Sequence, residues 1–175
     1  MMERERQMST ADPVTPLFRR VVTGHDANGN AIVLSDGFAE NRKFPDAKVS
    51  STMMWSTASS PTDFSGEEDE GARMLGTAPP AGGSRFTMME FQPGHDYHGM
   101  HRTDTVDYAI CLEGEIDMFL NETDFVTLRA GDVLIQRGTY HGWANRSSAR
   151  CRLAVVLLDA TPKRSGSIAG GGNAR

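Results

Sequence analysis

The chain has 175 residues, a formal net charge of −5 and a pI near 5.5, and its length fits one domain. Its arginines and lysines are scattered rather than clustered, so we expect no nucleic-acid partner. The start of the chain lacks the pattern of a signal peptide, and the longest apolar run is only strand-sized. We therefore expect a cytoplasmic protein that does not enter a membrane.

The N-terminal third of the chain is β-rich. Residues 1–16 are polar and contain two prolines, which predicts a flexible arm or a segment that pairs with a partner subunit. An Asn28-Gly29 turn between two β-rich runs is typical of a β-hairpin. The strands predicted here are 18–23, 31–35 and 49–56. Residues 59–83 are rich in proline, glycine and acidic side chains, and form either a functional lid or a disordered loop.

Short strands continue through the second half. Turn residues recur with the spacing of a β-sandwich or barrel, and no helical period lies between them. The strands predicted in this half are 85–91, 107–112, 115–120, 125–129, 133–136, 141–145 and 150–159. Cys111 and Cys151 fall inside apolar strands, so we expect small buried hydrophobic residues before a disulfide or a reactive thiol. The glycine-rich segment 163–175 is expected to be a disordered tail.

Two blocks of histidine, carboxylate and glycine residues lie between residues 93 and 145. The first block comprises His95, His98, His101, Asp107 and Gly114. The second comprises Gly131, Asp132, Gly138, His141 and Asn145. Together the two blocks resemble the cupin superfamily, and in particular its small single-domain members. The resemblance implies an all-β fold, a jelly-roll barrel (double-stranded β-helix) over residues 17–162, with added N-terminal strands and the long loop.

In metal-binding cupins, two first-block histidines, a carboxylate and the second-block histidine hold a divalent ion. The resemblance assigns the carboxylate to Asp107 and the second-block histidine to His141. His101 stands one residue farther from Asp107 than the pattern places its second histidine, and His98 is either a fourth ligand or a loop histidine. Imidazole and carboxylate donors suit Fe, Mn, Zn or Ni. The alternative is a site without metal, in which these side chains only form hydrogen bonds.

Strand alternation sorts the neighbouring side chains. If Asp107 points inward, Ala109 and Cys111 do so too, and Tyr108 faces the other way, where packing is favoured over a role in substrate binding. An inward His141 places Trp143 and Asn145 on its own face. Trp143 is then either an apolar wall for a ligand or part of the core.

Two more residues complete the set of candidate site residues. Arg137 could form a forked contact with a substrate carboxylate, with a surface cation as the alternative. Tyr140, beside His141, is a candidate hydrogen-bonding group for substrate. His25 and His95 are expected to be surface residues.

This set of candidate site residues favours a small-molecule enzyme of the lyase or isomerase type. Metal-assisted acid–base chemistry, with His101, His141, Asp107 and Arg137 as catalytic residues, would dehydrate, decarboxylate or cyclise an oxygenated organic substrate. An Fe(II)-dependent dioxygenase and a metal-free, non-catalytic binding protein are the alternatives. The resemblance and the need to cover sheet edges both predict a homodimer, with residues 8–23 at the interface.

Overall fold

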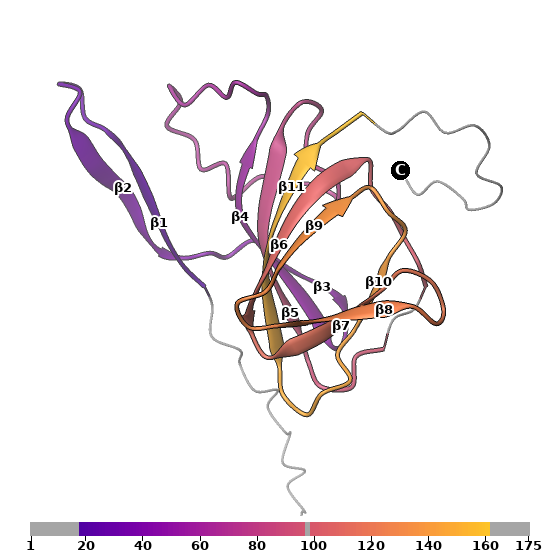
Figure 1. Cartoon of the computed structure of the whole chain (residues 1–175). Coiled ribbons are helices and arrows are strands. Elements are labelled where there is room, and N and C mark those ends of the chain that lie inside the picture. Colours follow the sequence, from indigo (N-terminus) through magenta and orange to yellow (C-terminus); the bar gives the residue numbers. More distant parts are fainter. Residues whose placement is uncertain (1–17, 97–98, 162–175) are drawn as a thin grey trace, which may run out of the picture. The chain divides into compact units, whose positions relative to one another are not determined.

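A computed structural model of the chain describes residues 18–96 and 99–161, and that part is built of antiparallel strands without a helix (Figure 1). The strands are β1 (Arg19–His25), β2 (Ala31–Phe38), β3 (Arg42–Asp46), β4 (Val49–Thr57), β5 (Ser84–Phe91), β6 (Thr105–Glu113), β7 (Glu115–Phe119), β8 (Phe125–Arg129), β9 (Val133–Arg137), β10 (Gly142–Ala144) and β11 (Cys151–Asp159). No helix in these ranges could cross a membrane. The predicted arm 1–16, the tail 163–175 and His98 lie outside the described residues.

The predicted hairpin is confirmed, and it belongs to a first compact unit that ends at Phe38. Strands β1 and β2 pair antiparallel, and Arg19 and Asp36 form an ion pair of 2.7 Å between them. At the turn, the Asp26 carboxylate accepts hydrogen bonds from the backbone amides of Asn28 and Asn30. These bonds fix the turn that joins the two strands.

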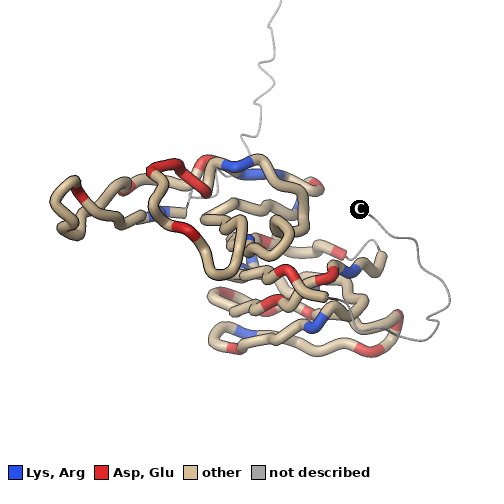
Figure 2. Tube along the Cα trace, turned by 90° about the horizontal axis from the view of Figure 1, so that it is seen from above, with Lys and Arg blue, Asp and Glu red and all other residues tan. Residues whose placement is uncertain are grey.

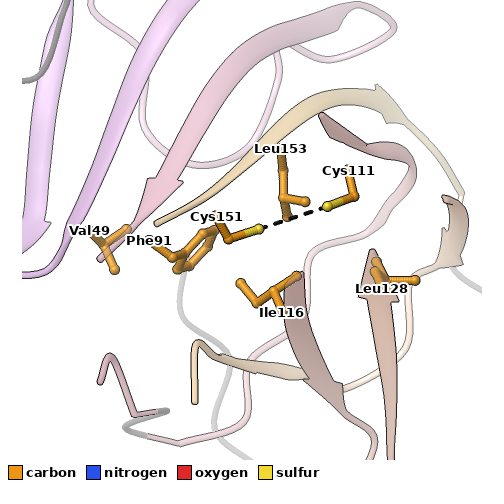
Figure 3. Packing of buried hydrophobic residues seen from close by; sticks show 7 residues of the cluster. All are labelled: Val49, Phe91, Cys111, Ile116, Leu128, Cys151 and Leu153. Carbon is orange, nitrogen blue, oxygen red and sulfur yellow. Dashed lines mark hydrogen bonds between the residues drawn. The ribbon is translucent and has the colours of Figure 1, made fainter. Parts of the chain in front are cut away.

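The second unit begins at Ala39 and contains two sheets. The larger has the order β3-β4-β5-β11-β6-β9, and the smaller has the order β10-β7-β8. Their facing sides share one apolar core, which Figure 3 shows in close view. Its buried members are Val49, Phe91, Cys111, Ile116, Leu128, Cys151 and Leu153.

The two cysteines lie inside this core and are both free, as predicted. Their sulfur atoms are 3.9 Å apart (Figure 3). Burial is the main cause that raises the pKa of both thiols above the ordinary value, which disfavours the reactive thiolate. They therefore act as small apolar side chains in the core.

The corner between β6 and β7 requires glycine. Gly114 has a φ of 73°, and a Cβ atom there would lie 2.3 Å from the carbonyl oxygen of Arg150. A side chain would therefore collide with backbone that cannot move freely. This glycine is the one that follows Asp107 by seven residues in the first motif.

Strand β3 is the one element of the described chain that the sequence did not predict. It contains Pro45, which interrupts the alternation of a strand and cannot donate to a ladder. The structure places β3 at the edge of the six-stranded sheet, where proline is tolerated.

The long loop 59–83 is held to the second unit by side chains that donate to its backbone carbonyls. Asn41 Nδ2 donates to Gly71 and Arg73, and Ser56 Oγ donates to Glu70. Arg85 Nη1 donates to Thr77 at 2.7 Å. These bonds favour an ordered loop over the disordered alternative.

Charged residues of both signs occur along the trace, and the acidic run 67–70 lies in the long loop (Figure 2). One cluster is deeply buried. Glu90 is 0% exposed, and its carboxylate accepts hydrogen bonds from Arg42 Nη2 at 2.8 Å, Arg152 Nε at 3.0 Å and Ser50 Oγ at 3.2 Å. The cluster joins β3, β4, β5 and β11 on the side of the sheet opposite the apolar core, because Glu90 and Phe91 alternate along β5.

Candidate functional site

The site begins with an isolated backbone bridge between the two sequence motifs. The amide of His101 donates to the carbonyl of His141 and the amide of His141 donates to the carbonyl of His101, each at 2.9 Å. The two imidazole rings are 4.4 Å apart between centroids and tilted by 52°. Segments forty residues apart in the chain thus bring both predicted histidines together.

His141 is buried and its ring is held on one side. Its Nδ1 lies 3.0 Å from the carbonyl oxygen of Thr139 and 3.0 Å from Nε2 of Gln136. The Thr139 carbonyl can only accept and the Gln136 amide nitrogen can only donate, so Nδ1 donates to the first or accepts from the second according to the tautomer of the ring. The indole of Trp143 meets the ring edge-on at 5.9 Å. These contacts fix the orientation of the His141 ring.

Asp107 lies on the inner face of β6. The strand alternates as predicted, with Asp107, Ala109 and Cys111 buried and Tyr108 exposed. Asp107 is 7% exposed, and its Oδ1 atom is buried without a hydrogen-bond partner. Burial raises the pKa of Asp107 most, while a Thr105 hydrogen bond and the charge of His101 oppose the rise.

The pKa values of the two histidines are lowered, whereas that of Asp107 is raised. Burial lowers the pKa of His141, and the Thr139 carbonyl opposes that shift. Burial and then the neighbouring His141 lower the pKa of His101, although Asp107 raises it. His101 keeps an exposed surface. Because the ordinary imidazole pKa is 6.5, both rings are uncharged at neutral pH.

The donor types at this site match those that hold a divalent metal, but their spacing does not. Two imidazoles and a carboxylate with an unpartnered oxygen are the ligands of a facial triad. Among residues 18–96 and 99–161, however, no three His, Cys, Asp or Glu side chains are close enough together to share one ion. We therefore derive no reaction step through a metal.

Gln136 is a site residue that the sequence analysis missed. It pairs with Asp107 across β6 and β9, is 3% exposed, and donates from Nε2 to the Thr139 carbonyl at 2.9 Å. Its Oε1 atom, like Oδ1 of Asp107, is buried without a partner. The alternation of β9 could have revealed it, because only one of two adjacent residues can face Asp107.

The other neighbour is Arg137, and its position agrees with the predicted surface cation and not with the forked contact to a substrate. Arg137 is exposed and lies on the outer face of β9, with Val133 and Ile135. Its side chain therefore points away from Asp107 and His141. Tyr108 likewise lies on the outer face of β6, where it is 42% exposed. The packing interpretation of Tyr108 agrees with this position, and the substrate-binding one does not.

The remaining candidates have structural contacts. Asn145 is fully buried, and its amide donates to the carbonyls of Phe91 and Ala149, so its donors are already used. Trp143 packs against the apolar core as well as against His141, which agrees with its predicted core role, and its role as a wall for a ligand stays a prediction. Tyr140 stacks under the guanidinium of Arg102 at 5.5 Å.

The two histidines expected at the surface differ in position. His25 is exposed at the end of β1. The prediction for His95 was wrong, because its ring is 8% exposed and lies 3.5 Å from Asp46. An isolated backbone β-bridge pairs His95 with Asn145 and keeps it within the second unit.

Comparisons with known proteins agree with this architecture. The family model described as the cupin domain matches residues 87–157. The phomopsin biosynthesis cluster protein D of Diaporthe leptostromiformis is 32% identical over 97% of this chain and 93% of its own length. A cupin-domain-containing oxidoreductase of Neurospora crassa, srdB, is 32% identical over 89% of this chain and 84% of its own length. The chain belongs to the cupin family.

Among solved structures, this cupin is similar to a double-stranded β-helix domain protein from Klebsiella pneumoniae. The similarity covers 67% of the cupin and 83% of that chain, with 15% identity and a TM-score of 0.47. The family membership confirms the jelly-roll fold that the two motifs implied.

Proposed function

We propose that this cupin is an enzyme of small-molecule biosynthesis and that His101, Asp107 and His141 form its active centre. The observation that carries the proposal is the convergence of both motif histidines, with rings 4.4 Å apart, beside a buried carboxylate that has an unpartnered oxygen. Several relatives are named as proteins of biosynthesis clusters or as oxidoreductases, which supports a biosynthetic role.

The reaction that the site favours is proton transfer on an oxygenated organic substrate. Burial raises the pKa of Asp107 and lowers the pKa of His141, which favours a protonated carboxyl as the proton donor and a neutral imidazole as the proton acceptor. Nε2 of His141 is the accepting atom in the tautomer whose Nδ1–H donates to the Thr139 carbonyl. Asp107 then supplies a proton to an oxygen of the substrate, as dehydration, decarboxylation or cyclisation requires.

An Fe(II)-dependent oxidation is the second candidate. The oxidoreductase names of four relatives favour it, and the donor types suit iron. In that case His101, Asp107 and His141 would be the ligands, and the metal would supply oxygen activation. The spacing of the described side chains is the observation against it.

One experiment separates the two reactions. Purified protein is incubated with a metabolite extract from a strain of the producing organism that lacks the gene, and substrates and products are identified by mass spectrometry. Acid–base chemistry predicts a product of unchanged mass or one that has lost water or carbon dioxide. A product that has gained oxygen or lost two hydrogens, formed only by iron-loaded protein, would contradict it.

The matched variants are Asp107→Asn and His141→Gln, with His25→Gln as the control. Asp107→Asn keeps the shape of the side chain, His141→Gln keeps a polar side chain of similar length, and both remove the proton chemistry. His25 is exposed in the other compact unit, so its replacement should leave turnover unchanged. Equal turnover in all three variants would remove the proposed active centre.

A further inference from the structure

A single row of residues crosses the inner face of the six-stranded sheet at its polar end. Cross-strand pairing defines the row, which runs from β4 through β5, β11 and β6 to β9. Its members are Ser56, Arg85, Leu157, Asp107 and Gln136. All five are buried, and the two rows below them lead into the apolar core.

Three members of this row carry a buried polar atom without a hydrogen-bond partner. These atoms are Nε of Arg85, Oδ1 of Asp107 and Oε1 of Gln136. The described residues contain six such atoms, so half of them fall in this one row. Native proteins satisfy nearly all buried polar groups, so a row with three exceptions is a place where a bound molecule could supply the partners. Such a molecule would accept at Arg85 and donate at Asp107 and Gln136.

Arg85 carries a buried charge that no acidic side chain compensates. It is 7% exposed, and among residues 18–96 and 99–161 no carboxylate forms an ion pair with it. Its printed bonds go to neutral acceptors, the Thr77 carbonyl at 2.7 Å and the Ser51 hydroxyl at 3.4 Å. Burial lowers its pKa. Removing a guanidinium from water without an opposite charge nearby is unfavourable, and a bound anion would offset that cost.

The geometry points to a carboxylate-binding role for Arg85, and so to a substrate that is an organic acid with a hydroxyl or similar donor group. This inference rests on the proposed function and names the substrate class of that site. Leu157 separates Arg85 from Asp107 in the row, so their backbones are two strand spacings, or about 10 Å, apart. A carboxylate held at Nε of Arg85 would direct the donor end of the same molecule toward Asp107 and Gln136.

The position of Arg85 explains why sequence reasoning favoured another arginine. Arg137 lies in the second motif beside the predicted site, but its side chain is on the outer face of β9. Arg85 lies outside both motifs, and only the pairing of β5 with β11 brings it into the row of Asp107. The two arginines therefore make a matched pair for a test.

The test uses acetate as the probe and acetamide as its neutral counterpart, at constant ionic strength. The Nε–H resonance of Arg85 in the full-length protein should shift saturably with acetate and stay unmoved with acetamide. Acetate should also raise the melting temperature. Arg85→Gln should weaken acetate binding by about tenfold or more, the effect of one lost charge-assisted hydrogen bond, and Arg85→Lys should weaken it less. Arg137→Gln should bind acetate like the wild type.

An Arg85 resonance that does not respond to acetate would overturn the inference without any variant having to fold. Equal acetate binding by Arg85→Gln and the wild type would do the same. The test requires no turnover, so it is independent of the proposed reaction. Asp107→Asn and His141→Gln should lose turnover and still bind acetate. A wild-type protein that turns over its substrate but does not bind acetate would contradict the inferred substrate class and leave the proposed reaction standing.

Discussion

His101 and His141 hold each other in register through two reciprocal backbone hydrogen bonds of 2.9 Å, and their rings lie 4.4 Å apart as a result. Because backbone atoms make the bridge, replacing either side chain leaves it in place. His101→Gln and His141→Gln should therefore fold, and each should lower turnover about 100-fold or more, the usual contribution of a general acid or base. Turnover in the mass-spectrometric assay and circular dichroism of the folded variants check both parts. Loss of folding in both would contradict the backbone origin of the bridge.

The buried carboxylate of Asp107 is expected to reduce stability while serving function. Its pKa is raised in the folded protein, so the folded state binds more protons than the unfolded state between the ordinary value of 3.8 and the raised one. Above that window the ionised carboxylate opposes folding. Asp107→Asn should therefore raise the melting temperature at neutral pH, and the gain should shrink as the pH falls through the window.

Asp36→Asn is the contrasting control for this experiment. Its hydrogen bond with Arg19 lowers the pKa of Asp36, so the replacement should bring no gain in stability at neutral pH. If Asp107→Asn melts at or below the temperature of the wild type at neutral pH, burial of the Asp107 carboxylate does not destabilise the folded protein.

The two histidines predict a loss of stability in mild acid. The pKa of each is lowered below 6.5 in the folded protein, so as the pH falls below 6.5 the unfolded chain takes up protons that the folded chain does not. The free energy of unfolding then decreases. Urea denaturation at pH 7 and about pH 5.5 measures the difference, which His141→Gln should reduce. An unchanged difference in this variant would show that His141 is not the titrating group.

The Glu90 cluster should be a main support of the second unit. Glu90 is 0% exposed, and the arginines that bind it, Arg42 and Arg152, have side chains only 12% and 20% exposed. Glu90→Gln leaves those guanidinium groups without their buried counter-charge, which should cost about 3–5 kcal/mol of unfolding free energy. Denaturant unfolding measures it. The exposed turn residue Glu122, replaced by Gln, should change stability by less than about 0.5 kcal/mol; a similar small effect of Glu90→Gln would contradict the prediction.

The sequence predicts a homodimer with residues 8–23 at the interface, and the described residues offer a second surface for a test, the edge strand β9. This strand ends the six-stranded sheet and exposes Val133 and Ile135, which are 61% and 52% exposed. Exposed sheet edges with apolar side chains need a cover. Light scattering should give twice the monomer mass of 19.1 kDa, and Ile135→Lys should shift the protein toward the monomer. A wild-type monomer at all concentrations would contradict the prediction.

Local sequence signals determined most of the strand pattern. Turn residues and β-rich runs located ten of the described strands, and alternation along β6 gave the inward side of Asp107, Ala109 and Cys111. These features depend on neighbouring residues, so a single sequence contains them. The two motifs also indicated the family, which the comparisons confirmed.

Tertiary structure alone decided which polar atoms meet. The register between β5, β11, β6 and β9 sets Arg85, Asp107 and Gln136 in one row, and it turns Arg137 outward. A shift of one residue in any pairing would reverse these faces, because strand side chains alternate with a period of two. Register between strands that are distant in the chain is a property of the assembled sheet, and no local pattern of this sequence encodes it.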